Sequence, residues 1–168
     1  MKTSCLRDRS TEQLYRCAVH VIQIVVALVW LHAGYEKVLK ADFAGSLSAT
    51  LTKFAGSNPH TWYQAWLTGP MMDKAVVLGQ MVQWGEVLVG VGLLAALVLV
   101  HRKSSVRAVR SGYWITLLAF GGSMVMSANF YLAAGWMSTS TAGFNLMLLG
   151  VEATLFVLNI CLLKKAKE

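Results

Sequence analysis

The sequence predicts an all-α integral membrane protein, an antiparallel bundle of four transmembrane helices. The chain has 168 residues, of which 56% are hydrophobic and only 14% are charged, and its mean hydropathy is +0.54. This composition is too apolar for an ordinary soluble domain. A helix needs roughly 20 apolar residues to cross about 30 Å of hydrocarbon. Four segments meet this requirement, at residues 17–35, 76–100, 113–134 and 143–163.

Both chain ends are predicted to lie in the cytoplasm. Residues 1–16 form a polar leader before the first span, and residues 164–168 form a short tail after the fourth. Eleven of the 15 basic residues fall in the leader, in the tail and between the second and third spans. The positive-inside rule places these segments in the cytoplasm and the other two connections outside. The net charge of +7 therefore reflects topology and not binding to nucleic acid.

The connections between the spans differ in length. The first external connection, residues 38–74, is long enough that we expect helices of its own. Apolar residues recur at helical spacing in its first half, and Asn58 with Pro59 ends that pattern. A second helical turn carries Trp62, Tyr63 and Trp66. These aromatic residues fit either a belt at the lipid headgroups or a lid over an external mouth of the bundle.

Two glutamates, Glu86 and Glu152, fall near the middle of the second and fourth spans. A carboxylate at this depth costs roughly 2.5 to 3.5 kcal/mol on insertion scales, so it usually faces a bundle interior, a cavity or a partner. Gln83 lies one turn from Glu86, and Asn145 and Asn159 share a face with Glu152 because all three recur every seven residues. The two glutamates are thus candidates for one buried polar site between the second and fourth spans. They serve either in function or as structural contacts.

Further polar residues gather at the ends of the spans. The motif HAGYEK places His32, Glu36 and Lys37 at the outer boundary of the first span, and Asn129 reaches a similar depth on the third. Glu36 and Lys37 either belong to a binding site or are interfacial charges that extend toward water. Asn129 and Asn145 can equally form hydrogen bonds between helices.

Metal, haem and thiol relay chemistry are not predicted. The four histidines are spread over both membrane faces, and no two of them form a close pair on one helix. At the inner end of the first span, His20 and Gln23 fit membrane anchors or interhelical hydrogen bonds. The three cysteines form no CxxC motif, so they are expected to be packing residues.

Four blocks of the sequence resemble the DoxX/DoxD family, and they are closest to its DoxD branch. These blocks are LHAGYEKVLKADF, NPHTWYQAWL, GQMVQWGEVLVGVGLL and NFYLAAGWMSTSTAGFNLML, and the likeness extends from about Trp30 to Leu163. The resemblance implies a membrane subunit of thiosulfate:quinone oxidoreductase in a bacterial or archaeal plasma membrane. In that family, this subunit passes electrons from a small sulfur donor to a quinone. The residues that correspond to the family motifs are Leu31, Gly34, Lys37, Glu86, Gly90 and Asn145.

This resemblance suggests roles for individual side chains. Thiosulfate is a dianion, so its site needs positive charge and hydrogen-bond donors. We expect this site at the external mouth, formed by His32, Lys37, Lys40, Asn129 and Asn145. A quinone carbonyl that gains negative charge needs a proton donor. We expect Glu86 or Glu152 to act as this catalytic acid, with Gln83 as a relay and Trp84 beside the quinone ring.

The partner and the exact activity stay open at this stage. The family type works with a DoxA subunit or fused domain, and no DoxA-like extension follows the fourth span here. The chain is compatible with a separate partner protein and also with a protein that acts alone or on another substrate. It is equally compatible with an oligomer. A non-catalytic membrane anchor or assembly subunit of another redox complex is the alternative function. A small transporter has less support, because inverted repeats and broken helices are not evident.

Overall fold

The computed structural model describes residues 2–39, 42–102 and 105–166, and within residues 2–10 only the backbone is described. Every regular element in these ranges is a helix. The four long helices are α1 (Lys2–Leu39), α4 (Ala75–Arg102), α5 (Val106–Ala134) and α6 (Thr139–Lys165). Each provides a stretch that is long and apolar enough to cross a membrane, which in α1 begins at Thr11. The predictions of an all-α protein and of four membrane-length helices are confirmed.

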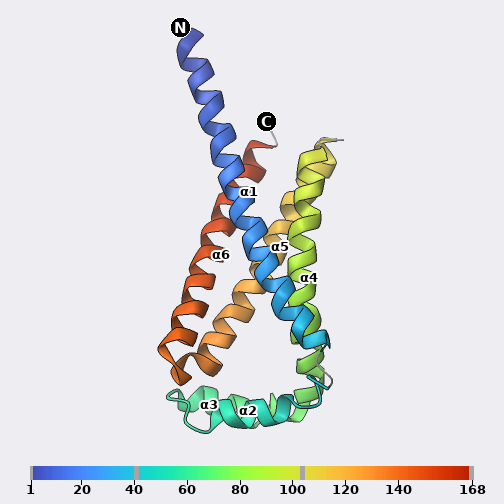
Figure 1. Cartoon of the computed structure of the whole chain (residues 1–168), viewed down its shortest axis with the longest axis vertical. Helices are drawn as coiled ribbons and strands as arrows, with labels where there is room; N and C mark the ends of the chain where they lie inside the picture. The colour runs from blue at the N-terminus through green and yellow to red at the C-terminus, as the bar shows by residue number, and fades with distance from the viewer. Residues whose placement is uncertain (1, 40–41, 103–104, 167–168) are drawn as a thin grey trace.

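The four long helices stand side by side, and both chain ends lie at the same end of the molecule (Figure 1). We call this end the terminal end. In the described part of the chain, α1 packs against α4, α4 against α5, and α5 against α6. The interface between α1 and α6 is much smaller. Helices α4 and α6 therefore lie apart, with α1 and α5 as the neighbours that reach both of them.

The long helices extend further than the apolar segments predicted. Helix α1 runs through the expected polar leader, and α5 begins at Val106 within the expected link. The start of α5 is capped by Ser105, whose hydroxyl oxygen accepts a hydrogen bond from the amide of Ala108 at 3.1 Å. Ser138 caps α6 in the same way. Apolarity marks only the part of a helix that lies in hydrocarbon, whereas capping decides where the helix begins.

Two short helices, α2 (Leu47–Ala55) and α3 (Thr61–Thr68), lie across the end opposite the termini (Figure 1). We call them the cap. Helices are thus present where the sequence predicted them between residues 38 and 74. Leu51, Tyr63 and Leu67 form the centre of a small core that also includes residues of the long helices. The Asn58 amide donates to the Leu132 carbonyl at 2.9 Å, which ties the cap to α5. The 3₁₀ helix η1 (Met72–Lys74) connects the cap to α4, and η2 (Gly135–Met137) connects α5 to α6.

The main core lies between the long helices, and the outer surface of these helices is apolar as well. Ala27, Leu93 and Phe120 are fully buried in this core. On the outside, large aliphatic residues such as Leu88 and Leu118 are exposed, the latter to 74%. An apolar exterior of this kind is expected of helices that face lipid, because lipid tails are as apolar as the side chains themselves.

Candidate functional site

Lys37, near the cap-side end of α1, forms an ion pair with Glu86 in the cap-side half of α4. The Lys37 ammonium donates to both carboxylate oxygens of Glu86, at 2.8 and 2.7 Å. The Glu86 side chain is 1% exposed, whereas that of Lys37 is 26% exposed. The carboxylate is therefore enclosed, and its cation lies at the edge of the bundle. The lysine also lies over the ring of Phe43, 5.8 Å from its centroid.

Two glycines allow α1 and α4 to approach closely beside this ion pair. A Cβ atom on Gly34 would lie 2.7 Å from Val87 Cγ2 and 2.8 Å from the Val87 backbone nitrogen. A Cβ atom on Gly90 would meet the side chain of Leu31 and would lie 2.8 Å from the Ala27 carbonyl oxygen. Only glycine fits at such positions without a shift of the backbone. The close approach brings Lys37 within reach of the neighbouring helix.

Glu152 occupies a different environment on α6. It is fully buried, and the indole nitrogen of Trp30 donates to its Oε1 at 2.7 Å. The hydroxyl of Ser127 donates to its Oε2 at 2.9 Å. Both oxygens of Glu152 thus have a partner, and both partners are neutral. One partner comes from α1 and the other from α5.

The structure gives the two glutamates separate partners rather than the single site that their depth suggested. Helix α1 provides a partner to each, with Trp30 for Glu152 and Lys37 for Glu86. These two residues are seven positions apart, which places them on one face of α1 about 10.5 Å apart along its axis. The physical reason for the separation is that α4 and α6 are not neighbours in the bundle.

The residues expected to bind a sulfur anion are not brought to one point. Lys37 is engaged with Glu86, while His32 lies 3.5 Å from Glu36 with both side chains mostly exposed. Asn145 is buried and donates to the Thr141 carbonyl of its own helix at 2.9 Å. Asn129 lies beneath the cap. Lys40 lies outside the described residues.

The residues expected to hold the quinone ring also lie apart from the buried carboxyl groups. Trp84 is 50% exposed and lines a groove of about 480 Å³ on the outer surface between α1 and α4. Gln83 is buried and donates to the Gln80 side chain at 2.9 Å. This bond runs along α4, between two residues of the same helix.

An apolar pocket of about 360 Å³ lies between the cap and the cap-side ends of α4 and α5. Leu51, Met126 and Phe130 contribute to its apolar walls, and Tyr63 and Asn129 add polar groups. The Tyr63 hydroxyl is 3.3 Å from the Asn129 side-chain oxygen, to which it donates. The Phe130 ring lies 6.3 Å from the Trp30 ring, centroid to centroid. The pocket wall therefore contacts the residue that holds Glu152.

The sequence interpretation missed Trp30, Ser127 and Tyr63 as parts of this region. Trp30 carried a signal, because a tryptophan inside a span needs an acceptor for its N–H group and this one lies seven residues before Lys37. Ser127 has a weaker signal, its spacing of four residues from Ser123 on one face of α5. For Tyr63, together with Trp62 and Trp66, the sequence left open a headgroup belt or a lid over the external mouth. Both tryptophans are exposed, whereas Tyr63 faces inward.

Among the described residues, no group of three or more histidine, cysteine, aspartate or glutamate side chains is arranged to hold a metal ion. Cys17 and Cys161 are free thiols on different helices, and both are exposed. Comparison with protein-family models, with curated proteins and with solved structures finds no match for this chain. The geometry of the buried carboxyl groups and of the adjacent pocket is therefore the structural basis for a function.

Proposed function

We propose that this protein is the membrane subunit of a quinone-linked oxidoreductase of the DoxD type, which oxidises thiosulfate or a related small sulfur compound. The observation that carries this proposal is the position of Glu152. Its partners are the neutral groups of Trp30 and Ser127, and Trp30 contacts the wall of an apolar pocket through Phe130. Glu152 itself does not line this pocket, so we propose it as the buried proton store from which a quinone bound there is protonated.

The quinone ring is placed in the 360 Å³ pocket beneath the cap. This volume falls within the range of small-molecule sites, about 300 to 1,000 Å³. Leucine, methionine and phenylalanine side chains form most of its lining, which suits a flat apolar ring with an isoprenoid tail. The Asn129 amide donates one N–H to the Val125 carbonyl, and its second N–H can donate to a quinone carbonyl. This placement replaces Trp84 with Phe130 as the aromatic residue beside the ring.

The sulfur anion is placed at the cap end, beside Lys37. An ammonium group has three N–H donors, and two of those of Lys37 point to the Glu86 carboxylate. The third donor, at the exposed edge of the bundle, can bind an oxyanion. Support also comes from the resemblance to the DoxD branch, because Leu31, Gly34 and Lys37 of α1 meet Glu86 and Gly90 of α4 at one interface.

The overall reaction balances without a further reactant. Two thiosulfate ions form one sulfur–sulfur bond to give tetrathionate and release two electrons. The quinone takes up these two electrons and two protons and becomes a quinol. The quinone is thus the electron acceptor, and Glu152 delivers a proton to the reduced carbonyl. The direct partner of the subunit is proposed to be a DoxA-like protein or another redox subunit.

We further propose a plasma-membrane location with the terminal end in the cytoplasm and the cap outside, as in an antiparallel bundle with both termini inside. Basic residues support this orientation. Arg16, Arg102, Arg107 and Lys165 all lie toward the terminal end of the long helices. Positive charge is retained on the cytoplasmic side of membrane proteins. The sulfur donor would then be oxidised at the outer face.

The test uses protein purified from native membranes together with the subunits that copurify with it. Thiosulfate-dependent reduction of decylubiquinone is followed by the absorbance of the quinone. Glu152→Gln is expected to lower the turnover by about 100-fold, the lower range of acid catalysis. Thr154→Val is the matched control, because Thr154 is exposed on the same helix and its hydroxyl donates to the Gly150 carbonyl at 2.8 Å. Equal turnover in the wild type and Glu152→Gln would remove Glu152 from the mechanism.

The same experiment separates an enzyme from an anchor. A non-catalytic anchor predicts that Glu86→Gln and Glu152→Gln lower the yield of the complex and leave the turnover per complex unchanged. Mass spectrometry of the purified complex measures this yield and identifies the partner. A wild-type complex that reduces no quinone with thiosulfate or any other small sulfur donor would overturn the proposed function.

A further inference from the structure

A row of buried polar side chains runs through the half of the bundle on the terminal side of Glu152. We call this row the polar column, and its members come from three helices. They are His20 and Gln23 of α1, Tyr113, Thr116 and Ser123 of α5, and Asn159 of α6. All six are buried, and the most accessible of them, His20, is 9% exposed. Polar side chains at this depth of a membrane bundle are costly, so those that are present usually have a structural or functional role.

Helix geometry places the members of the column in order between the terminal end and Glu152. Asn159 follows Glu152 by seven residues on α6, and Gln23 precedes Trp30 by seven residues on α1. Each is therefore about 10.5 Å nearer the terminal end than the Glu152 site. Ser123 is one turn from Ser127 on α5, which places it within that interval.

Hydrogen bonds join the helices within one layer of the column, and helix periodicity places the next layer toward the terminal end. Gln23 donates to the Leu93 carbonyl at 3.1 Å and to the Thr116 hydroxyl at 3.4 Å. His20 lies one turn nearer the terminal end than Gln23, and Tyr113 lies one turn nearer than Thr116. Because α1 and α5 both start at the terminal end (Figure 1), these two pairs form successive layers of the same column.

Four polar atoms of the column have no hydrogen-bond partner among the described residues. They are His20 Nε2, Gln23 Oε1, the Tyr113 hydroxyl oxygen and Asn159 Oδ1. Buried polar atoms almost always have a partner, either in the protein or in an ordered water molecule. All four atoms lie on the terminal side of Glu152. Ordered water is the usual partner of such buried polar atoms.

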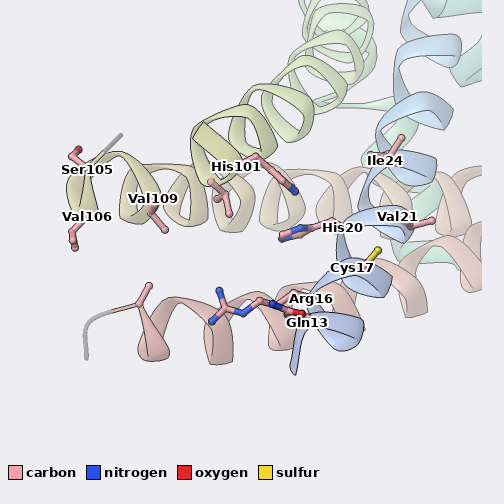
Figure 2. A pocket seen from close by; sticks show the side chains of 12 residues that line it. Gln13, Arg16, Cys17, His20, Val21, Ile24, His101, Ser105, Val106 and Val109 are labelled. Carbon is pink, nitrogen blue, oxygen red and sulfur yellow. The ribbon is translucent and has the colours of Figure 1, made fainter. Parts of the chain in front are cut away.

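The column opens into a pocket of about 650 Å³ at the terminal end. Arg16, Cys17, His20 and His101 are among the residues that line it. Figure 2 shows the rings of His20 and His101 near one another, and their centroids are 4.9 Å apart. His101 Nδ1 donates to the Leu97 carbonyl at 2.9 Å, which leaves its Nε2 as an acceptor when the ring is neutral. His20 thus connects the pocket to the unpaired groups behind it.

We propose that the polar column is a water-filled proton path from the terminal-end pocket to Glu152. Protons enter at His20, pass along water held by Gln23, Tyr113 and Asn159, and reach the carboxyl group by way of Ser123. The carboxyl group gives one proton to the reduced quinone, and the path returns one from solution, so no other reactant is needed. The purpose of the path rests on the proposed function, but its existence can be tested without quinone.

The test measures how fast the Glu152 carboxyl proton exchanges with deuterium. Infrared spectroscopy follows the carboxyl C=O stretch of the purified protein after transfer to D₂O, and Glu152→Gln identifies the band. Asn159→Leu, Gln23→Leu and His20→Phe are expected to slow the exchange by roughly tenfold or more, as for any step whose barrier rises by about 1.4 kcal/mol. Thr154→Val, which alters only the outer surface of α6, is expected to exchange at the wild-type rate.

A second measurement requires no change within the column. Cys17 is an exposed thiol that lines the pocket, so a bulky maleimide on it blocks the entrance. In a Cys5→Ser, Cys161→Ser background this label is expected to slow the exchange. The matched control is a label on Cys161, which is exposed but does not line that pocket, in a Cys5→Ser, Cys17→Ser background.

The outcomes separate the path from the proposed function. Wild-type exchange rates in the column variants and in the protein labelled at Cys17 would overturn the path, as would the absence of any carboxyl band that depends on Glu152. If exchange depends on the column but the wild type reduces no quinone, the path holds and the oxidoreductase proposal fails. If quinone is reduced but the column variants exchange deuterium at the wild-type rate, protons reach the quinone by another route and the proposed path is wrong.

Discussion

Glu86 and Glu152 are equally buried, yet the surroundings of the two carboxyl groups differ in charge. Glu86 is held by the ammonium of Lys37 at the cap end, whereas Glu152 is held deeper in the bundle by an indole and a hydroxyl. A carboxylate paired with a cation is electrically balanced as long as both charges stay. A carboxyl group with neutral partners can take up and release a proton without leaving a partner charge uncompensated.

This difference assigns separate tasks to the two ends of the membrane domain. The ion pair at the cap end fixes α1 against α4 and presents a cation at the surface. The neutral site lies where α1, α5 and α6 meet, between the apolar pocket and the polar column. We infer that the ion pair of Lys37 and Glu86 stabilises the bundle and binds an anion. The neutral site around Glu152 is inferred to transfer protons. Substitutions on α1 can test this division, because that helix provides a partner to both glutamates.

The largest effect is expected for Lys37→Met. This change removes the cation and leaves the Glu86 carboxyl group buried with no charge partner. The loss of one partner from a buried ion pair lowers the free energy of unfolding by about 3 to 5 kcal/mol. The measurement is thermal unfolding in detergent. The double variant Lys37→Met, Glu86→Leu is the control, and it is expected to recover most of the lost stability. If the single variant is as stable as the wild type, the pair has no structural role.

A smaller effect is expected for Trp30→Phe, which removes the N–H donor to Glu152 and keeps an aromatic ring beside Phe130. A buried acceptor left without its partner costs about 1 to 3 kcal/mol. The same unfolding assay measures it, with Trp114→Phe as the control because Trp114 is half exposed on the outer face of α5. A double-mutant cycle with Glu152→Leu separates the hydrogen bond from the loss of ring volume. A coupling energy near zero would contradict the assigned hydrogen bond.

The sequence predicted that the two glutamates are buried inside the bundle, but it did not predict their partners. Hydropathy located the four spans, and the spacing of seven residues correctly grouped Asn145, Glu152 and Asn159, all of which are buried. Partners of Glu86 and Glu152 come from positions 49 and 122 residues away. Such pairs depend on how each helix is rotated and on which helices are neighbours, and a single sequence does not contain either quantity. The pocket beneath the cap is likewise a result of tertiary packing.

The sequence also grouped residues that lie at a similar depth. The structure shows that some of these residues differ in exposure. His32 and Lys37 belong to one short motif, but they point in different directions from α1. Lys37 turns toward α4, whereas His32 lies near Glu36 on the outer face. Five residues of helix correspond to a rotation of about 500°, or 140° beyond one full turn. Residues of one short motif thus face different surfaces of the helix.

The smallest effect is expected for His32→Ala, which tests whether an ion pair of the same motif matters when it is exposed. The side chains of His32 and Glu36 are 74% and 68% exposed, and His32 Nε2 lies 3.5 Å from Glu36 Oε1. Exposed pairs contribute about 0 to 1 kcal/mol because water screens both charges. The free energy of unfolding is therefore expected to change by less than about 0.5 kcal/mol, the usual limit for surface substitutions. The apparent affinity for thiosulfate is expected to stay the same, because the anion is placed at Lys37. A large loss of affinity in His32→Ala would move the anion site to the outer face of α1. Glu36→Gln would then be expected to strengthen binding, since it removes a carboxylate beside that histidine.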